Sequence, residues 1–406
     1  MLCGLLGKTL SHSYSPQIHK YLGDYSYDLF EKQPEELADF LKNGRFSGIN
    51  VTIPYKKDVI PYCTELTDCA KSLGAVNTIV RRSEGTLVGH NTDYFGFQYM
   101  VAKTGLSVSE KKVLVLGSGG ASVTAVAVLK NLGAEVIVIS RNGTNNYSNL
   151  YLHTDASIIV NATPVGMYPN AGASPVNLDL FPRLEGVLDI VYNPARTKLI
   201  LDAEKRGILC ENGLSMLVAQ AKEAAEWFTG NSINDTVIER IRNTLRRQME
   251  NIILIGMPGC GKTTVGQLIA EITGKRFVDA DAEIVRTVGM SIPEIFNKEG
   301  ESGFRRWETK ILDQIGQKSG LVIATGGGCV TKEENYPLLH QNGTIYWLQR
   351  DISALATDGR PLSQAGKMEQ MWQIRRPMYE RFADYTVDNN KMPEDAVAKI
   401  LKGSMI

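Results

Sequence analysis

The stretch KKVLVLGSGGASVTAVAVLKNLGAEVIVIS, residues 111–140, decides the fold of the middle of the chain. It contains an apolar strand, a glycine turn that opens a helix, and a second apolar strand. Two more apolar runs follow it, SIIVNATP (157–164) and GVLDIVYNP (186–194). Strands that are apolar along their whole length and alternate with helices are typical of a parallel sheet covered on both faces. We therefore expect an α/β architecture.

The glycine turn at residues 117–121 is a candidate dinucleotide site because it follows a strand and precedes a helix. Ser122 stands where the pattern G-x-G-x-x-G has its last glycine. The second strand ends at residues 140–142 with Arg141 and no acid. A guanidinium there suits a ribose 2′-phosphate and favours NADP over NAD, although Arg141 could also be a solvated loop cation. Residues 143–156 are few for another helix and strand.

Residues 1–95 alternate short apolar runs with helical stretches. SGINVTIP (47–54) and AVNTIV (75–80) predict strands because β-branched residues dominate them. PEELADFLKNG (34–44) predicts a helix, with proline near its start and glycine after its end.

Four polar clusters interrupt this first segment. They are SHSYSP (11–16), NVTIPYK (50–56), GAVNT (74–78) and GHNTDYFG (89–96). Each alone is ordinary turn chemistry, and a serine before a helix is often only a cap. Together they predict a pocket for a hydroxylated, anionic ligand. Lys56 and Asp93 could run acid–base chemistry on a carbonyl/alcohol couple.

A second α/β unit begins after a boundary that we place near Arg247–Asn251, where a basic helix end meets the strand IILIG. GMPGCGKT, residues 256–263, then fits G-x-x-x-x-G-K-[ST] between a strand and a helix. Backbone N–H groups and the helix N-terminus would hold phosphates, Lys262 would reach the β/γ-phosphates and Thr263 would bind Mg²⁺. Cys260 lies beside Lys262 at this helix N-terminus, which favours a reactive thiolate.

Carboxylates and arginines follow the phosphate loop. Asp279 and Asp281 stand two residues apart at the end of a predicted strand, so both side chains should face the phosphate site. The further segments are GFRRWE (303–308), TGGG (325–328), RPL (360–362) and RRPMY (375–379). This set suits an anionic acceptor and the charge of a phosphoryl transition state.

The composition excludes several protein classes. The chain has 406 residues, 44 basic and 44 acidic, and this balance argues against nucleic-acid binding. None of the six cysteines is spaced C-x-x-C, so we expect free thiols in a reducing cytoplasm. Neither a secretion signal nor an apolar run long enough for a membrane span is evident. The oligomeric state is left open.

The segment from residue 250 onward resembles shikimate kinase. The matching motifs are the phosphate loop, D-x-D, F-R-R-x-E, G-G-G, R-P-L and R-x-P-x-Y, in order. The resemblance implies that Asp281 orients and deprotonates the attacking hydroxyl and that Asp279 and Thr263 hold Mg²⁺. The implied shikimate ligands are Asp281, Arg305, Gly327 and Arg375. The implied ATP ligands are Gly259, Cys260, Gly261, Lys262, Thr263, Thr264 and the lid residue Arg360. Residues 351–359 contain no arginine, unlike the lid of many members.

Residues 1–247 resemble shikimate dehydrogenase. The matching motifs are H-S-x-S-P, N-V-T-x-P-x-K, G-A-V-N-T, N-T-D-x-x-G, G-x-G-G-A, N-A-T-P-x-G-M, D-x-x-Y-x-P and G-x-x-M-L-x-x-Q. The resemblance implies Lys56 and Asp93 as the catalytic pair. The implied substrate ligands are Ser13, Ser15, Thr52, Asn77, Asp93, Tyr192 and Gln220. The implied NADP ligands are Gly117, Ser118, Gly119, Gly120, Ala121, Ser140, Arg141, Asn142, Ile190 and Gly213.

The predicted domains are an α/β substrate-binding domain (1–95, with helices at about 225–247), a Rossmann-like NADP domain (96–224) and a P-loop kinase domain (250–406). The resemblances predict a bifunctional cytoplasmic enzyme that reduces 3-dehydroshikimate with NADPH and phosphorylates shikimate with ATP and Mg²⁺. One alternative is an NAD-dependent quinate/shikimate dehydrogenase fused to a kinase for another small molecule. Another is a regulator that binds these metabolites without turning them over.

Overall fold

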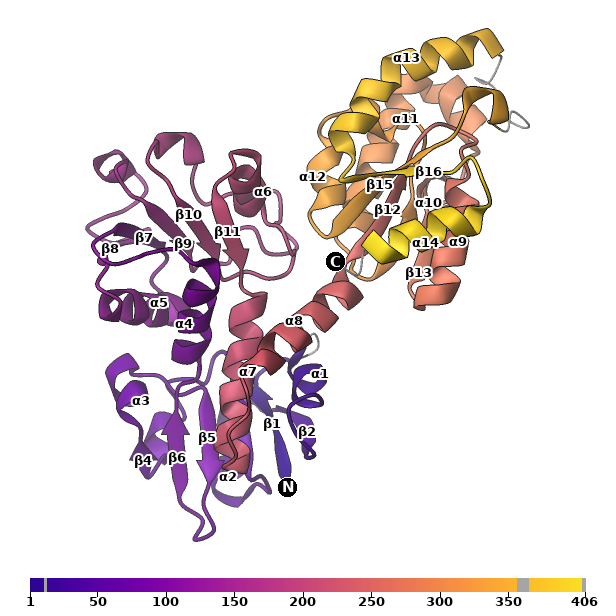
Figure 1. Ribbon diagram of the computed structural model, residues 1–406. Helices are drawn as coiled ribbons and strands as arrows, with labels where there is room; N and C mark the ends of the chain where they lie inside the picture. Colours follow the sequence, from indigo (N-terminus) through magenta and orange to yellow (C-terminus); the bar gives the residue numbers. More distant parts are fainter. Residues whose placement is uncertain (11–12, 356–364, 404–406) are drawn as a thin grey trace. The chain divides into compact units, whose positions relative to one another are not determined.

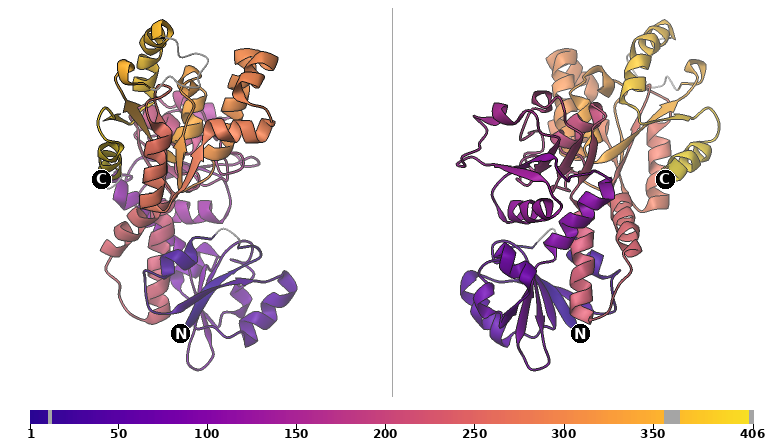
Figure 2. Two further views of the ribbon diagram at one scale, coloured as in Figure 1. Left: turned by 90° about the vertical axis from the view of Figure 1, so that its right-hand side faces the viewer. Right: turned by 60° about the vertical axis from the view of Figure 1, so that its left-hand side comes forward.

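The computed structural model describes residues 1–10, 13–355 and 365–403. It divides into two compact units, residues 1–243 and 244–406, and we describe each by itself (Figures 1 and 2). The division falls inside helix α8 (Thr236–Met249), a few residues before the boundary predicted near Arg247–Asn251. No helix in the described ranges is long and apolar enough to cross a membrane.

The first sheet of the first unit is mixed, and its strand order is β2-β1-β3-β5-β6-β4. Its strands are β1 (Leu2–Gly7), β2 (Ser26–Glu31), β3 (Gly48–Val51), β4 (Glu65–Leu66), β5 (Thr78–Arg81) and β6 (Leu87–His90). The helices of this part are α1 (Ser15–His19), α2 (Leu37–Asn43) and α3 (Asp68–Leu73). Strand β3 is shorter than the strand predicted at residues 47–54, and strand β5 is displaced from the strand predicted at residues 75–80. In both cases, residues next to the strand turn away from the sheet to build a polar site.

The second sheet is parallel throughout, in the order β11-β10-β9-β7-β8. Its strands are β7 (Lys112–Leu116), β8 (Glu135–Ile139), β9 (Ile158–Asn161), β10 (Gly186–Asp189) and β11 (Leu209–Asn212). The accompanying helices are α4 (Asp93–Thr104), α5 (Gly120–Asn131), α6 (Lys198–Lys205), α7 (Leu214–Thr229) and α8. Between β8 and β9 the chain forms only a 3₁₀ turn, Leu150–His153, so β8 has no neighbour beyond β7 among the described strands.

Alternate residues of strand β7 pack on opposite faces of this sheet, which explains why the strand is apolar along its length. Val113 and Val115 belong to a buried cluster with residues of α4, α5 and α7. Leu114 and Leu116 belong to another cluster with residues of α6. The predicted parallel sheet with two covered faces is therefore confirmed.

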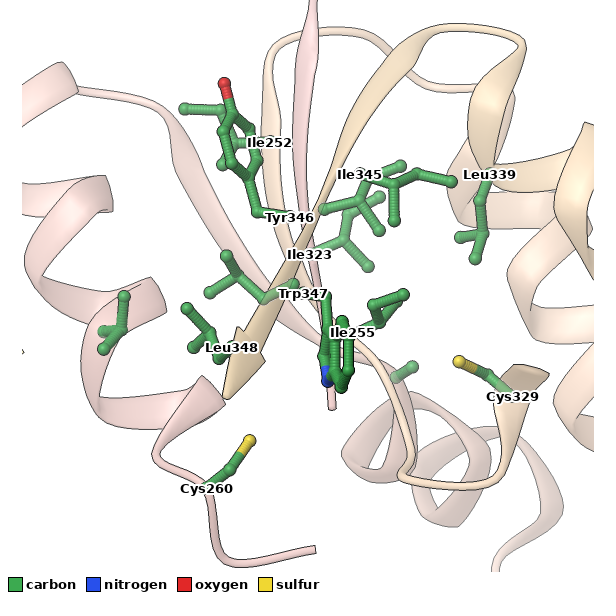
Figure 3. Packing of buried hydrophobic residues seen from close by; sticks show 14 of the residues in the cluster. Ile252, Ile255, Cys260, Ile323, Cys329, Leu339, Ile345, Tyr346, Trp347 and Leu348 are labelled. Atoms are coloured by element: carbon green, nitrogen blue, oxygen red, sulfur yellow. The ribbon is translucent and has the colours of Figure 1, made fainter. Parts of the chain in front are cut away.

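The second unit has one parallel sheet, in the order β13-β14-β12-β15-β16. Its strands are β12 (Asn251–Ile255), β13 (Arg276–Asp279), β14 (Leu321–Ala324), β15 (Gly343–Gln349) and β16 (Tyr385–Asp388). Its helices are α9 (Lys262–Thr273), α10 (Ala280–Val288), α11 (Ile292–Gly316), α12 (Asn335–His340), α13 (Ala365–Phe382) and α14 (Pro393–Gly403). One large apolar cluster includes strand residues such as Ile323 and Trp347 (Figure 3). The carboxyl ends of all five strands meet at one edge, where ligands bind in open α/β sheets.

Candidate active sites

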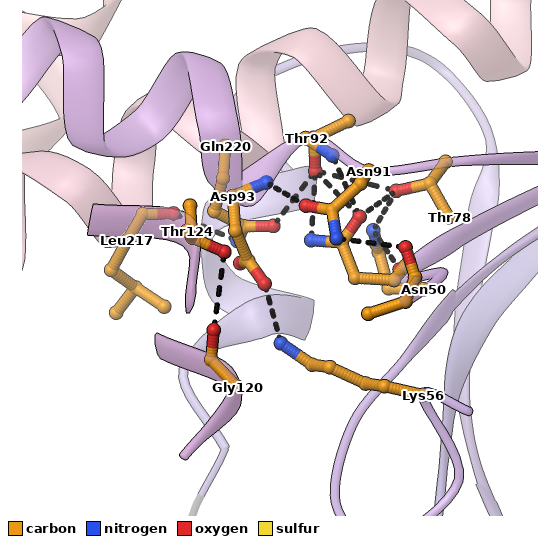
Figure 4. A network of polar contacts seen from close by, with 12 residues as sticks. Asn50, Lys56, Thr78, Asn91, Thr92, Asp93, Gly120, Thr124, Leu217 and Gln220 are labelled. Carbon is orange, nitrogen blue, oxygen red and sulfur yellow. Dashed lines mark hydrogen bonds and ion pairs between the residues drawn. The ribbon is translucent and has the colours of Figure 1, made fainter. Parts of the chain in front are cut away.

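An ion pair between Lys56 and Asp93 marks the first site (Figure 4). Lys56 follows strand β3, and Asp93 is the first residue of helix α4. The Lys56 Nζ atom lies 2.5 Å from Asp93 Oδ2, and the two side chains keep 29% and 16% of their accessible surface. The pair is thus close enough to share a proton-transfer role and exposed enough to meet a ligand.

Asn77, Thr92 and Gln220 form a hydrogen-bond network beside this pair (Figure 4). Asn77 Oδ1 accepts from the backbone N–H of Thr92 at 2.7 Å, and Asn77 Nδ2 donates to Thr92 Oγ1 at 3.1 Å. Thr92 Oγ1 also donates to Gln220 Oε1 at 3.3 Å. The network brings two predicted substrate ligands, 143 positions apart in the chain, next to Asp93. Thr92 was not predicted as a contact, although it lies within the motif N-T-D-x-x-G.

Gly96 explains how helix α7 comes close enough to place Gln220 there. A Cβ atom on Gly96 would lie 2.7 Å from Met216 O and 2.9 Å from Gln220 Cβ. Real Cβ atoms essentially never approach that closely. The glycine of one motif therefore serves to pack α4 against the helix that carries the other motif.

The described residues of the motif SHSYSP, 13–16, lie near Tyr192 and near Tyr27 of strand β2. Ser13 Oγ accepts from the N–H of Ser15 at 3.2 Å, and the ring of Tyr14 meets that of Tyr192 edge-on, with 6.2 Å between centroids. Burial raises the pKa of both tyrosines, so both hydroxyls stay neutral donors. The N–H of Thr52 binds Leu6 O at 2.9 Å at the end of β3.

The glycine turn after β7 has the form of a cofactor site. Gly117 adopts a φ of 108°, and a Cβ there would lie 2.9 Å from Ala162 O. Gly119 and Gly120 have open space where a Cβ would be, so a ligand can approach their backbone. The buried Ser122, in place of the last glycine, donates its hydroxyl to Gly117 O at 2.7 Å. This bond holds the turn closed. Ser118 and Ala121 complete the segment between β7 and the first turn of α5.

The end of β8 presents Arg141 to solvent. The N–H of Ser140 binds Asn145 O at 3.1 Å, and Asn142 continues into the loop that replaces the usual helix. Arg141 lowers the otherwise raised pKa of Tyr147, which places the two side chains in one electrostatic neighbourhood. The adenosine end of a dinucleotide would therefore meet a loop at this edge.

Asp189 organises the edge at β10, and sequence reasoning missed it. Its carboxylate accepts from Asn161 Nδ2 at 2.9 Å, from the N–H of Val191 at 3.0 Å and from Thr197 Oγ1 at 2.6 Å. These bonds tie the ends of β9 and β10 to the start of α6. Its place as the first letter of D-x-x-Y-x-P was the available signal.

Ile190 and Gly213, both predicted at the cofactor, lie against each other. A Cβ on Gly213 would lie only 1.9 Å from Ile190 O. Only glycine therefore fits in this contact, and helix α7 begins directly after it.

The phosphate loop of the second unit has the predicted strand–loop–helix context. Gly256, Gly259 and Gly261 all have positive φ, as a loop with converging N–H groups requires. Lys262 Nζ donates to Gly256 O at 2.9 Å and to Met257 O at 3.0 Å, so the ammonium lies folded over the loop. Thr264 is exposed in the first turn of α9.

Asp279 and Asp281 lie in different elements, which corrects the expectation that both carboxylates stand at the end of one strand. Asp279 ends β13 and caps α10 by accepting from the N–H groups of Asp281 and Ala282. Its other oxygen accepts from Thr263 Oγ1 at 3.1 Å, beside the loop. Asp281 already belongs to α10 and points to Gly326, where a Cβ would lie 2.7 Å from its Oδ1. The strand ends at Asp279 and the helix begins at Ala280, so Asp281 lies in the helix and not in the predicted strand.

Each glycine of the triplet after β14 lies close to a different part of the site. A Cβ on Gly326 would meet Asp281 and Glu308, one on Gly327 would meet Pro258 of the phosphate loop, and one on Gly328 would meet the Arg305 guanidinium. The triplet therefore lets acid, loop and arginine converge.

Arg305 is buried and paired with two acids. It lies 2.7 Å from Glu308 and 3.2 Å from Glu301. Burial raises the pKa of Glu308, against the opposing effect of Arg305. Glu308 is the acid of the motif F-R-R-x-E, and the sequence alone predicts no role for it. In the structure it holds Arg305 beside Asp281. The Arg375 Nη1 atom donates to Gly327 O at 3.1 Å. This bond brings together two of the predicted shikimate ligands.

The predictions for Cys260 and Arg360 have a different outcome from those above. Cys260 is fully buried and packs in the apolar cluster, as Cys329 does, so a rapidly alkylated thiol is not expected (Figure 3). A helix N-terminus and a nearby lysine do not make a thiol accessible, and accessibility is needed for reaction. Arg360 lies outside the described residues.

Comparison with known proteins gives the class of each unit. The model of the shikimate dehydrogenase substrate-binding domain matches residues 5–79, and that of shikimate kinase matches residues 258–404. A shikimate dehydrogenase (NADP(+)) of Caldicellulosiruptor saccharolyticus is 36% identical over 256 residues, which cover 55% of this chain and 91% of that protein.

Solved structures resemble the same part of the chain. Shikimate dehydrogenase 1 from Peptoclostridium difficile matches with a TM-score of 0.56 and 36% identity, covering 60% of this chain and 97% of its own. A chorismate mutase/shikimate 5-dehydrogenase fusion from Clostridium acetobutylicum matches with a TM-score of 0.57 and 35% identity, covering 60% and 96%.

These matches define an oxidoreductase unit followed by a kinase unit. The chain belongs to the shikimate dehydrogenase family and carries a shikimate kinase domain at its C-terminus. The predicted fusion and both predicted enzyme classes, an oxidoreductase and a phosphotransferase, are therefore confirmed. The individual site residues and the domain boundaries stay predictions.

Replacing Arg141 with alanine should weaken NADPH binding by about 10- to 150-fold and NADH binding far less. The guanidinium can pair with a 2′-phosphate, and a charge-assisted hydrogen bond is worth about 1.5–3 kcal/mol. NADH has no phosphate at this position. Titrating both cofactors into parent and variant measures the difference. An equal loss for both would show that Arg141 only supports the loop.

Replacing Asp189 with asparagine should change how stability depends on pH. Burial raises the pKa of Asp189 to about 6, above an unfolded value of about 4. Its protonation therefore stabilises the fold fully below about pH 4, and this contribution, at most about 3 kcal/mol, is lost as pH rises through about 6. An amide can keep the three hydrogen bonds and does not titrate.

The measurement is the melting temperature of parent and variant between pH 4.5 and 7. The parent minus variant difference isolates Asp189, because His19, whose pKa burial lowers to about 3, acts in the opposite direction in both proteins. We expect this difference to fall as pH rises. A constant difference would contradict the assignment.

Proposed function

We propose that the first unit reduces 3-dehydroshikimate to shikimate with NADPH, and that the second transfers the γ-phosphoryl group of ATP to the 3-hydroxyl of shikimate. The supporting observation is that predicted catalytic residues lie in contact within each unit. Lys56 pairs with Asp93 in the first, and Lys262 accompanies the Thr263–Asp279 contact in the second. The product of the first reaction is then the acceptor of the second.

In the reduction, the glycine turn would hold NADPH, which would supply a hydride for the substrate's carbonyl carbon. The carbonyl oxygen gains negative charge as the hydride arrives, and the ammonium of Lys56 delivers the proton that completes the alcohol. Asp93 holds the ammonium and can accept a hydrogen bond from a neighbouring substrate hydroxyl. Asn77 and Gln220 orient the remaining hydroxyls, since both amides lie in the adjoining network.

In the phosphorylation, Asp281 accepts the proton of the 3-hydroxyl of shikimate. The oxygen of that hydroxyl forms a bond to the γ-phosphorus while the bond from the γ-phosphorus to ADP breaks. Lys262 and the N-terminus of α9 stabilise the phosphate charge. Arg305 and Arg375 hold the carboxylate of shikimate. Mg²⁺, when bound, neutralises further charge. Thr263 and Asp279 offer it two hard oxygens, which suffices where phosphates and water complete the shell.

Two alternatives are distinguishable by assay. An NAD-dependent quinate/shikimate dehydrogenase joined to a different kinase would prefer NADH, which the exposed Arg141 and the absence of an acid in residues 140–142 disfavour. A metabolite-sensing regulator would bind shikimate without turnover, which the paired Lys56 and Asp93 disfavour.

The deciding experiment supplies 3-dehydroshikimate, NADPH, ATP and Mg²⁺ to the full chain and follows both products. We expect NADPH oxidation to precede ADP formation, and shikimate 3-phosphate to accumulate. Replacing NADPH with NADH, or 3-dehydroshikimate with 3-dehydroquinate, tests the first alternative. Ligand binding without any product would support the regulator.

A further inference from the structure

The buried hydroxyl of Tyr379 has no role in the chemistry above, yet it touches the acceptor site. Tyr379 lies on helix α13, one turn after Arg375, and its side chain is fully buried. Its hydroxyl donates to Gly327 O, the same carbonyl oxygen that accepts from Arg375 Nη1 at 3.1 Å. Two donors from one helix thus converge on a single backbone atom.

The ring of Tyr379 is held independently of that bond. It stacks on Trp347 of strand β15, with 5.7 Å between centroids and 18° between planes. Burial holds the pKa of the phenol well above its usual value, so the hydroxyl remains a donor throughout the neutral range. The position of the hydroxyl is therefore set by the core of the unit, whereas the Arg375 side chain is long and partly exposed.

Gly327 itself lies between the helix and the phosphate loop. A Cβ there would lie 2.6 Å from Pro258, so the residue is already in tight contact with the loop. The Tyr379 hydroxyl also lies 3.9 Å from Met257 Sδ, but a thioether is a weak acceptor. The hydroxyl therefore donates to the carbonyl oxygen of Gly327, and it is also in hydrogen-bond contact with the Arg375 side chain.

Arg375 bonds Gly327 O through Nη1, so turning the guanidinium as a whole toward the acceptor takes this donor away from the carbonyl. Gly327 is partly buried, and a carbonyl that loses its donor without gaining water costs about 1–3 kcal/mol when fully buried and less here. A second, fixed donor removes most of this cost.

We propose that Tyr379 is a positioning residue that keeps Gly327 in place and satisfies its carbonyl, so that Arg375 is released to bind the carboxylate of the acceptor. This inference rests on the proposed roles of Gly327 and Arg375 in the kinase reaction. It assigns to Tyr379 an effect on acceptor affinity and not on the nucleotide.

The test is Tyr379→Phe in the full chain, with Tyr385→Phe as the matched control. Phenylalanine keeps the stacked ring and removes only the hydroxyl, and Tyr385 is a half-exposed tyrosine of the same unit. Kinetics of ADP formation are measured with shikimate or ATP varied, without NADP⁺. Kinetics are preferable to binding because the dehydrogenase unit also takes up shikimate.

We expect Tyr379→Phe to raise KM for shikimate by about tenfold, with kcat and KM for ATP within about twofold of the parent. The control should leave all three unchanged. An unchanged KM for shikimate would overturn the proposal. A parallel rise in KM for ATP would also overturn it, because the hydroxyl would then act through the phosphate loop or through general packing. A parent chain without shikimate-dependent ADP formation would instead contradict the proposed kinase function.

Discussion

Lys56→Ala should lower the rate of 3-dehydroshikimate reduction by about 10²- to 10⁴-fold, the range that a positioned acid–base group contributes. Hydride addition leaves an alkoxide that needs a proton, and the Lys56 ammonium, 2.5 Å from Asp93, is placed to give it. The loss should appear in kcat. Phosphorylation of added shikimate should continue at the parent rate, because Lys56 belongs to the other compact unit.

The matched control is Lys57→Ala, which removes an exposed lysine next in sequence. It should retain both activities. If Lys56→Ala kept near-normal reduction, Lys56 would not be the proton donor, and another group near Asp93 would have to be found.

The second large effect is expected for Lys262→Ala, which should reduce phosphorylation by about 10²- to 10³-fold, as the loss of one preorganised charge-stabilising donor typically does. The ammonium now bound to Gly256 O and Met257 O would turn to the β/γ-phosphates once they fill the loop. Reduction of 3-dehydroshikimate should be unaffected.

Lys399→Ala, an exposed lysine on α14, serves as the control. Both activities are measured on each variant. A collapse of reduction in Lys262→Ala would contradict independent units and would place the functional boundary elsewhere than the end of α8.

Local patterns predicted the elements well and their ends poorly. The apolar strand β7, the glycine turn and the phosphate loop each follow from residues that are adjacent in sequence. The strand predicted at residues 47–54 ends at Val51, because Thr52 to Lys56 turn away from the ladder to build the site. Strand β5 starts at Thr78, three residues after the predicted start, and the side chain of Asn77 next to it accepts from the N–H of Thr92.

The sequence could not predict which polar side chains form hydrogen bonds with one another. Asp189 meets Asn161 across 28 residues, and Gln220 meets Thr92 across 128. Such bonds depend on the order of strands in the sheet and on the packing of α4 against α7. The motifs identified which residues to examine, but the burial of Glu308 and of Cys260 became evident only with the core assembled around them.

The length of helix α7 sets a distance between two predicted ligand-binding positions in the dehydrogenase unit. It starts at the turn of Gly213, which lies against Ile190, and it carries Gln220 seven residues later, at the network around Asp93. Seven helical residues span about 10 Å, and this length separates Gly213, a predicted NADP ligand, from Gln220, a predicted substrate ligand. Adding one residue within this interval would rotate Gln220 by about 100° around the helix axis and lengthen the interval by about 1.5 Å. The spacing of the motif G-x-x-M-L-x-x-Q therefore fixes the distance between a predicted NADP ligand and a predicted substrate ligand, and we expect it to tolerate substitution better than insertion.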